Sequence, residues 1–144
     1  MGQRTRAREC AFQMLYQWEV TREPMDSVAA AFWRVRSTTD ATRARAEALA
    51  RGACDSLERI DQLITGATRH WTLERIAAVD RNILRLGAYE LLAEPATPVA
   101  VVLDEAVELA KRFGEADSPK FVNGVLDAIM RRVRLRGGEG DGAA

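Results

Sequence analysis

Three arginines alternate at the beginning of the chain, at Arg4, Arg6 and Arg8. The apolar spacing that follows predicts a helix here, and the first turn of a helix already carries a partial positive charge. Cations are unfavourable at this end if stability alone matters, but guanidinium groups and free backbone N–H groups together bind phosphate well. Tyr16 lies off the apolar stripe and offers a ring for base stacking. The alternative interpretation of these arginines is a solvated arm.

A second combination of cation and aromatic ring lies near the end of the chain. Ser118 followed by Pro119 predicts a helix start, with the serine as the cap and the proline in the first turn. Lys120 and Phe121 come directly after it. An aromatic ring beside cations at a helix start is typical of a platform for single-stranded RNA. Packing of Phe121 at the edge of the core is the alternative.

Other kinds of site find little support in the sequence. His70 is the only histidine, and Cys10 and Cys54 are far apart, so we expect no metal cluster, no catalytic triad and no cofactor. Glu90 falls on an apolar helix face, where it is either a buried general acid or half of an ion pair with an arginine. We favour the ion pair. The glycine-rich stretch 137–144 lacks the strand and helix that a phosphate loop needs.

The composition excludes several classes of protein. The chain has 144 residues and a net charge of zero, with 47% hydrophobic and 29% charged residues. These values are typical of one globular domain and exclude disorder. Because the net charge is zero, any contact with nucleic acid must use a local patch. The longest apolar run, residues 99–103, is too short to span a bilayer, so we expect a cytoplasmic protein without a membrane partner.

Helical periodicity extends over most of the chain, and strand alternation is almost absent. The fold class is therefore all-α. We predict helices over residues 4–20, 26–35, 41–65, 78–92, 99–113 and 118–134. The helix over 78–92 is apolar on two sides, which predicts that it lies at the centre of the fold. We expect a single domain over residues 1–136 and a flexible tail over 137–144.

Several blocks of the sequence carry a resemblance to a known family. They are RARECA at 6–11, LYQW at 15–18, VDRNILRL at 79–86, YEL at 89–91, residues 98–111 and SPKFVNGVLD at 118–127. In this order, and covering about residues 4–134, they resemble the family of the transcription antitermination factor NusB. Leu103-Asp104 departs from the Ile-Asn that the family commonly has, and Pro119 follows the capping serine. These departures leave RNA affinity without a partner protein open.

The resemblance implies about seven helices arranged as two small packed bundles, and no enzyme activity. It also implies binding of the boxA element of nascent ribosomal RNA, a single strand, together with NusE, which is also a small-subunit ribosomal protein. That complex joins the elongating RNA polymerase through other Nus factors and prevents early termination. The family contains monomers and dimers, so a homodimer stays open.

The resemblance also assigns residues by position. The RNA-facing residues are those at the start of the first helix, Tyr16, and a continuation of the same surface at the start of the last helix: Arg4, Arg6, Arg8, Tyr16, Asp117, Lys120 and Phe121. The residues assigned to the NusE contact or its edge are Glu74, Asp80 and Arg85.

Two other functions compete with this interpretation. The first is a helical protein-binding module without RNA specificity of its own, related to the N-terminal domain of ribosomal RNA cytosine methyltransferases. The second is a small acid–base enzyme using Glu90, which requires that Glu90 line an open cleft.

Overall fold

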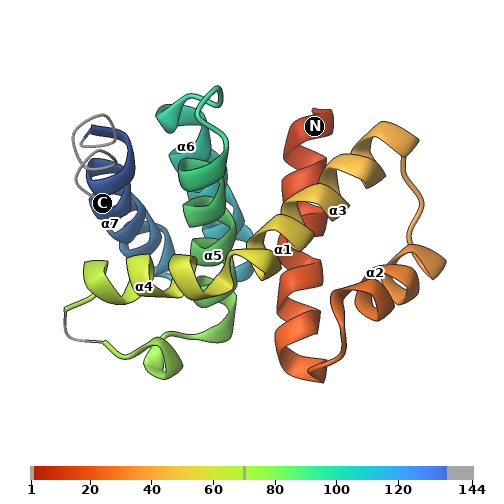
Figure 1. The fold of residues 1–144 in the computed structure, drawn as a ribbon, viewed down its shortest axis with the longest axis horizontal. Coiled ribbons are helices and arrows are strands. Elements are labelled where there is room, and N and C mark those ends of the chain that lie inside the picture. The colour runs from red at the N-terminus through yellow and green to blue at the C-terminus, as the bar shows by residue number, and fades with distance from the viewer. Residues whose placement is uncertain (1, 70, 136–144) are drawn as a thin grey trace.

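The computed structural model describes residues 2–69 and 71–135, and within them every regular element is helical (Figure 1). Seven α-helices follow one another: α1 (Gln3–Thr21), α2 (Met25–Arg34), α3 (Asp40–Asp55), α4 (Leu57–Ala67), α5 (Ala78–Ala93), α6 (Val99–Phe113) and α7 (Ser118–Met130). A 3₁₀ turn, Leu73–Arg75, precedes α5, and a π-helical turn, Arg131–Leu135, follows α7. Helices α1, α2 and α3 form one bundle and α4, α5, α6 and α7 form the other.

The prediction of an all-α fold is confirmed, and one predicted helix is divided. The expected helix over 41–65 breaks at Ser56, where ψ is 16° and the N–H donates to the Gly52 carbonyl at 3.0 Å. Glycine and serine are weak helix formers, so this turn is a favourable place for the break. The break lets α3 pack on α1 while α4 packs on α5 and α7. His70 and the predicted tail, 137–144, lie outside the described residues.

The start of α7 also differs from the prediction. Asp117 occupies the capping position and Ser118 is the first helical residue. The Ser118 hydroxyl is buried and accepts a hydrogen bond from the Glu115 backbone N–H at 2.9 Å, so it closes the preceding loop instead of capping the helix. Pro119 lies in the first turn, as predicted, where its missing N–H leaves no hydrogen bond unmade.

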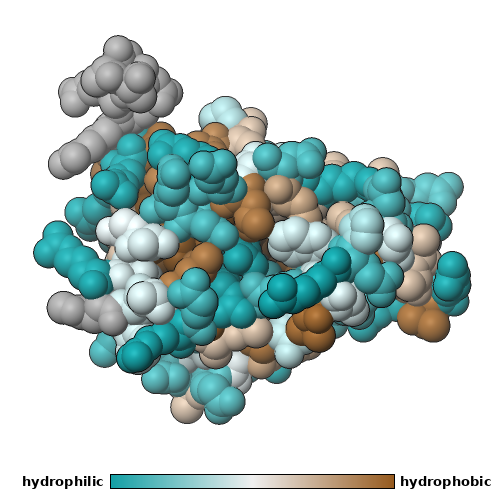
Figure 2. Space-filling view, turned by 60° about the horizontal axis from the view of Figure 1, so that its bottom comes forward, coloured by the Kyte–Doolittle hydropathy of each residue, from teal (hydrophilic) through white to brown (hydrophobic). Residues whose placement is uncertain are grey.

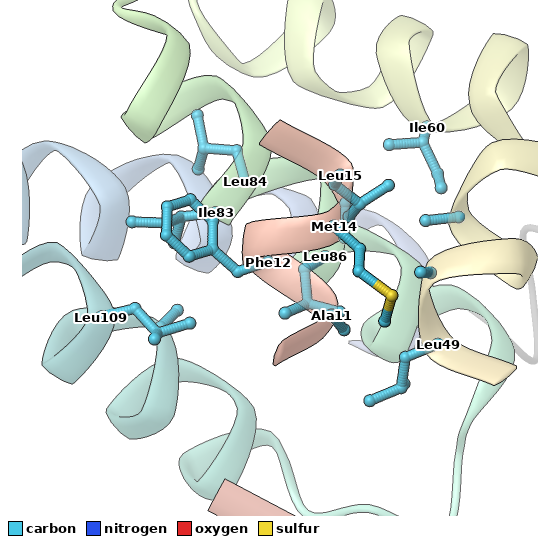
Figure 3. Packing of buried hydrophobic residues seen from close by; sticks show 14 of the residues in the cluster. Ala11, Phe12, Met14, Leu15, Leu49, Ile60, Ile83, Leu84, Leu86 and Leu109 are labelled. Carbon is cyan, nitrogen blue, oxygen red and sulfur yellow. The ribbon is translucent and has the colours of Figure 1, made fainter. Parts of the chain in front are cut away.

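Helix α5 is at the centre of the molecule, as its two apolar faces predict. It contacts α1, α3, α4, α6 and α7. Ile83, Leu84 and Leu86 are buried, and Figure 3 shows them among side chains from the neighbouring helices. Gly87 allows α7 to approach closely, because a Cβ there would lie 2.8 Å from Leu126 Cδ1. Helix α5 is therefore the element against which five of the other helices are positioned.

Candidate nucleic-acid interface

The beginning of α1 carries two cations that the protein does not neutralise. Arg4 is exposed and Arg6 is half-buried, and neither forms an ion pair within the described part of the chain. The first turn of α1 contains no acidic residue, and its capping position is held by Gly2 without a side-chain hydrogen bond. Backbone N–H groups and positive charge are therefore both available to an anion at this end.

Arg8 lies inside the protein, unlike Arg4 and Arg6. Its side chain is 4% exposed. It donates to Glu90 through Nε at 3.0 and 2.9 Å and through Nη2 at 2.8 Å, and to Glu105 through Nη1 at 3.0 Å. Burial acts to lower the pKa of Arg8, but the two carboxylates raise it above its ordinary value. We leave Arg8 out of the RNA-facing set, because its hydrogen bonds hold α1 against α5 and α6.

The predicted ion pair of Glu90 is confirmed by the same contacts. The Glu90 side chain is 2% exposed and its carboxylate is held by Arg8, so it does not line an open cleft. The acid–base enzyme that depended on an accessible Glu90 is therefore excluded. Among the described residues, no group of three or more His, Cys, Asp or Glu side chains is arranged to hold a metal ion.

Tyr16 lies further along α1, beside a hollow of about 230 Å³. The ring of Phe12 packs between Tyr16, at 6.5 Å, and Phe113, at 5.3 Å, measured between centroids. Arg36, from the loop between α2 and α3, lies at the same hollow, with its guanidinium 4.7 Å from the centroid of the Phe32 ring. Sequence reasoning missed Arg36, since a single arginine in a polar loop gives no local signal.

The start of α7 borders a second hollow, of about 170 Å³. Asp117 and Phe121 line it together with Trp71 and Asp80, and Lys120 is exposed beside it. Trp71 is 50% exposed and was also missed as a candidate. Burial raises the pKa of the Asp80 carboxyl, and the charges of Asp117 and Glu115 act in the same direction, while the nearby Ser118 hydroxyl acts to lower it.

These two sets of predicted RNA-facing residues do not form one uninterrupted surface. Arg4 borders a hollow with Ala96 and Thr97, just past the end of α5, whereas Asp117 lies near Asp80, where α5 begins. At 1.5 Å per residue, the 16 residues of α5 separate these ends by about 24 Å. Between them, α1 and α6 are joined by hydrogen bonds from Arg112 to Glu9 and from Thr5 to Glu105. Tyr16 shares its hollow with Val79 of α5, which places it toward the α7 end.

The side of the molecule on which α1 ends and α5 begins is brought forward in Figure 2. Hydrophilic residues dominate this face, and apolar residues lie between them in separate places instead of one continuous patch. Such a surface fits a polar ligand better than a lipid phase. In the part of the chain that the structure describes, no helix combines the length and the apolar character needed to cross a bilayer.

The residues assigned to a partner protein also differ in their accessibility. Glu74 is exposed on the 3₁₀ turn. Arg85 is 6% exposed and donates to Asp61 and Glu19, while Arg81 donates to Glu19 as well. Burial acts to raise the pKa of Glu19, but the hydrogen bonds and charges of these two arginines lower it below its ordinary value. Arg85 is therefore engaged within the protein, and Glu74 is open to solvent.

Comparison with known proteins identifies the family of this chain. The NusB family model matches residues 5–131. A relative from Sorangium cellulosum, named transcription antitermination protein NusB, is 49% identical over 133 residues, which cover 92% of this chain and 95% of the relative. The chain belongs to the NusB family. Another NusB, from Trichlorobacter lovleyi, is 41% identical over 90% of this chain and 91% of its own.

Solved structures of NusB share the fold. NusB from T. maritima superposes with a TM-score of 0.82 at 39% identity, covering 89% of this chain and 90% of that one. The NusB-family chain in a crystal structure of the antitermination factors NusB and NusE with dsRNA gives a TM-score of 0.83 at 31% identity, covering 91% and 98%. The resemblance inferred from the sequence blocks is thereby confirmed, and so are its seven helices in two bundles.

The blocks that carry the NusB resemblance contain residues of two kinds. Arg8, Glu90 and Arg85 are buried and join helices to one another. Tyr16 and Phe121 line hollows at the surface. Family motifs therefore mark the fold as well as the ligand surface, and only the burial of each residue separates the two roles.

Proposed function

We propose that this chain is a cytoplasmic transcription antitermination factor that binds boxA-type single-stranded RNA together with NusE. In this function it joins the elongating RNA polymerase through other Nus factors and catalyses no reaction. The observation that carries the proposal is that α1 begins with arginines that form no ion pair among the described residues and also presents an exposed tyrosine. The chain as a whole has a net charge of zero, so these arginines form a local positive patch. The relatives named transcription antitermination protein NusB, and the solved complex of NusB and NusE with dsRNA, support it.

In the proposed interface, each accessible residue has a chemical role. Arg4, Arg6 and Lys120 bind phosphates, and the rings of Tyr16 and Phe121 stack on bases. Asp117 lies next to Phe121 at the start of α7 and accepts hydrogen bonds from base amino groups. Three neutralised phosphates on a single strand give a log–log salt slope of about −2. This modest term means that NusE must supply much of the affinity.

For the partner protein, the proposed contact is the exposed carboxylate of Glu74, with the half-buried Asp80 at the edge of that contact. Glu74 is exposed on the turn that leads into α5, and Asp80 lies in the first turn of that helix. An exposed carboxylate such as that of Glu74 steers a basic partner and fixes its orientation more than it adds affinity. In this assignment Arg85 holds α5 against α1 and α4 and makes no direct contact.

The test of the RNA surface is the double variant Arg4→Ala with Arg6→Ala. In the presence of NusE we expect weaker binding of boxA RNA and a log–log salt slope shallower by about 1.4, which is two phosphate contacts on a single strand. Circular dichroism should show unchanged helicity. The matched control is Arg34→Ala with Arg59→Ala, because both arginines are exposed and form no ion pair with described residues. An unchanged slope in the first variant would contradict the proposed surface.

The competing function, a protein-binding module without RNA specificity, gives a different result in one experiment. Labelled boxA RNA is competed with unlabelled boxA RNA or with a scrambled RNA, with and without NusE. For an RNA-binding factor, unlabelled boxA RNA should displace the labelled RNA at lower concentrations than the scrambled RNA does. Equal competition by both RNAs, with NusE still bound, would favour the protein-binding module.

A further inference from the structure

The hollow beside Tyr16 differs from the other surface hollows in the chemistry of its walls. Its lining residues are three aromatic rings, one aliphatic side chain, two amides and one cation: Phe12, Tyr16, Phe113, Val79, Gln13, Gln17 and Arg36. None of them is acidic. By contrast, Asp80 and Asp117 line the hollow at α7, and Glu105 and Glu108 line the one between α1 and α6. Charge complementarity therefore favours a phosphate-bearing ligand at the Tyr16 hollow.

The size of the hollow and its aromatic wall fit one nucleic-acid base. Its volume of about 230 Å³ is below that of a pocket for a drug-sized molecule. Phe12 supports the ring of Tyr16 from within the protein, and Phe113 extends the same aromatic wall. Tyr16 itself is 36% exposed, so one side of its ring is accessible. A base that enters here stacks on a ring whose position is fixed by packing.

Gln13 provides an unused hydrogen-bonding group at this place. Its Oε1 atom is buried and has no hydrogen-bond partner among the described residues. Buried acceptors in folded proteins are nearly always paired, so the Gln13 amide gains a hydrogen bond when its side chain turns toward a ligand in the hollow. A glutamine amide offers an acceptor and a donor side by side, and this pair matches the N6 amino group and N7 of adenine.

Arg36 connects the hollow with the cations at the start of α1. It forms no ion pair in the described ranges, and it lies at the rim of the hollow. Burial raises the pKa of the Cys10 thiol, while the nearby charges of Arg6 and Arg36 act to lower it. Both charges therefore act on Cys10, which lies one turn after Arg6 on α1. A base that stacks on Tyr16 therefore brings its adjacent phosphate to Arg36.

We propose that this hollow is an adenine subsite, in which Tyr16 stacks on the base, Gln13 binds its N6 and N7 edge and Arg36 binds the adjacent phosphate. The inference rests on the proposed RNA-binding function and adds a base preference to it. It also adds Gln13 and Arg36 to the interface, neither of which the sequence motifs had singled out.

The experiment measures binding of three 12-nucleotide RNAs, (UUA)₄, (UUC)₄ and U₁₂, to the full chain with NusE by fluorescence polarisation. The parent protein should prefer (UUA)₄ over the other two by about tenfold. In Gln13→Leu the preference should fall within twofold while affinity for U₁₂ stays unchanged, because stacking and phosphate contacts remain. Gln62→Leu, at an exposed amide on α4, is the matched control and should keep the preference.

Two further variants test the site without changing a buried residue. Tyr16→Leu should weaken binding of all three RNAs, and Arg36→Gln should reduce the log–log salt slope by about 0.7. Adenine preference that persists in Gln13→Leu, a cytosine preference in the parent, or unchanged binding in both surface variants would overturn the subsite. If the parent binds boxA RNA and loses affinity with the Arg4/Arg6 double variant, the proposed function stands even when the subsite fails.

Discussion

The ion pair between Arg8 and Glu90 predicts a large and asymmetric loss of stability when either partner is removed. Glu90 accepts side-chain hydrogen bonds from Arg8 alone within the described chain, whereas Arg8 also donates to Glu105. Arg8→Ala therefore leaves a buried carboxylate without a partner and should reduce the free energy of unfolding by about 3–5 kcal/mol. Glu90→Ala leaves Arg8 with one partner, and we expect the smaller loss of a charged hydrogen bond, about 1.5–3 kcal/mol.

The assay is equilibrium unfolding in urea, followed by circular dichroism, for the two single variants and the double variant. Removal of both partners leaves neither of the two charges unpaired. The loss of unfolding free energy in the double variant should therefore be smaller than the sum of the two single losses, by about 2 kcal/mol. Arg6→Ala is the matched control, with the same residue type two positions away, and should change stability by no more than about 0.5 kcal/mol. Equal losses for Arg6→Ala and Arg8→Ala, or strictly additive losses in the double variant, would refute this reasoning.

Three further predictions concern stability. Gly87→Ala should lower the free energy of unfolding by about 1–3 kcal/mol, because the added Cβ would meet Leu126 of α7. Gly124→Ala has no atom within 4 Å of the added Cβ and should raise the free energy of unfolding by about 0.5–1 kcal/mol. Urea midpoints of the two variants that move in the same direction would count against the packing argument. Thr39→Ala should cost about 1 kcal/mol, because the threonine hydroxyl accepts from the Thr42 N–H at 3.1 Å and caps α3; an unchanged melting temperature would show that this cap is dispensable. Burial raises the pKa of Asp80, so ionisation of this carboxyl lowers stability as pH rises through its folded-state pKa. Asp80→Asn should therefore melt at a higher temperature than the parent at pH 7.5, and this gain in melting temperature should vanish below about pH 4. An equal gain at both pH values would rule out ionisation of Asp80 as the cause of the gain.

The parts of the fold that follow from periodicity could be predicted, and those that depend on packing between segments could not. Two apolar faces placed α5 at the centre, and a carboxylate on one of those faces led to the ion pair of Glu90. The break at Ser56 was missed, because the helical spacing of apolar residues continues across it and no proline marks it. Alternating arginines looked equivalent in the sequence, yet successive alternate positions on a helix point in different directions, and Arg8 points inward.

The candidate site shows the same division. Sequence blocks identified Tyr16, Asp117 and Phe121, which line surface hollows in the structure. They could not show that the starts of α1 and α7 lie at opposite ends of α5, because that separation follows from the direction in which each helix runs. Arg36 joins Tyr16 only through the packing of the α2–α3 loop against α1, and no spacing within the sequence reports it. Gln13 lies three residues before Tyr16 on the same helix, but the spacing does not show that its Oε1 atom lacks a hydrogen-bond partner among the described residues.

Helix α5 is a wall shared by both bundles, since it packs against α1 and α3 on one side and α4, α6 and α7 on the other. Neither bundle can keep a closed core once α5 leaves it. The two halves should therefore open together in one cooperative transition, without a half-folded species. Amide hydrogens in the middle of α1 and of α7 should exchange with solvent through the same global event, although those helices belong to different bundles.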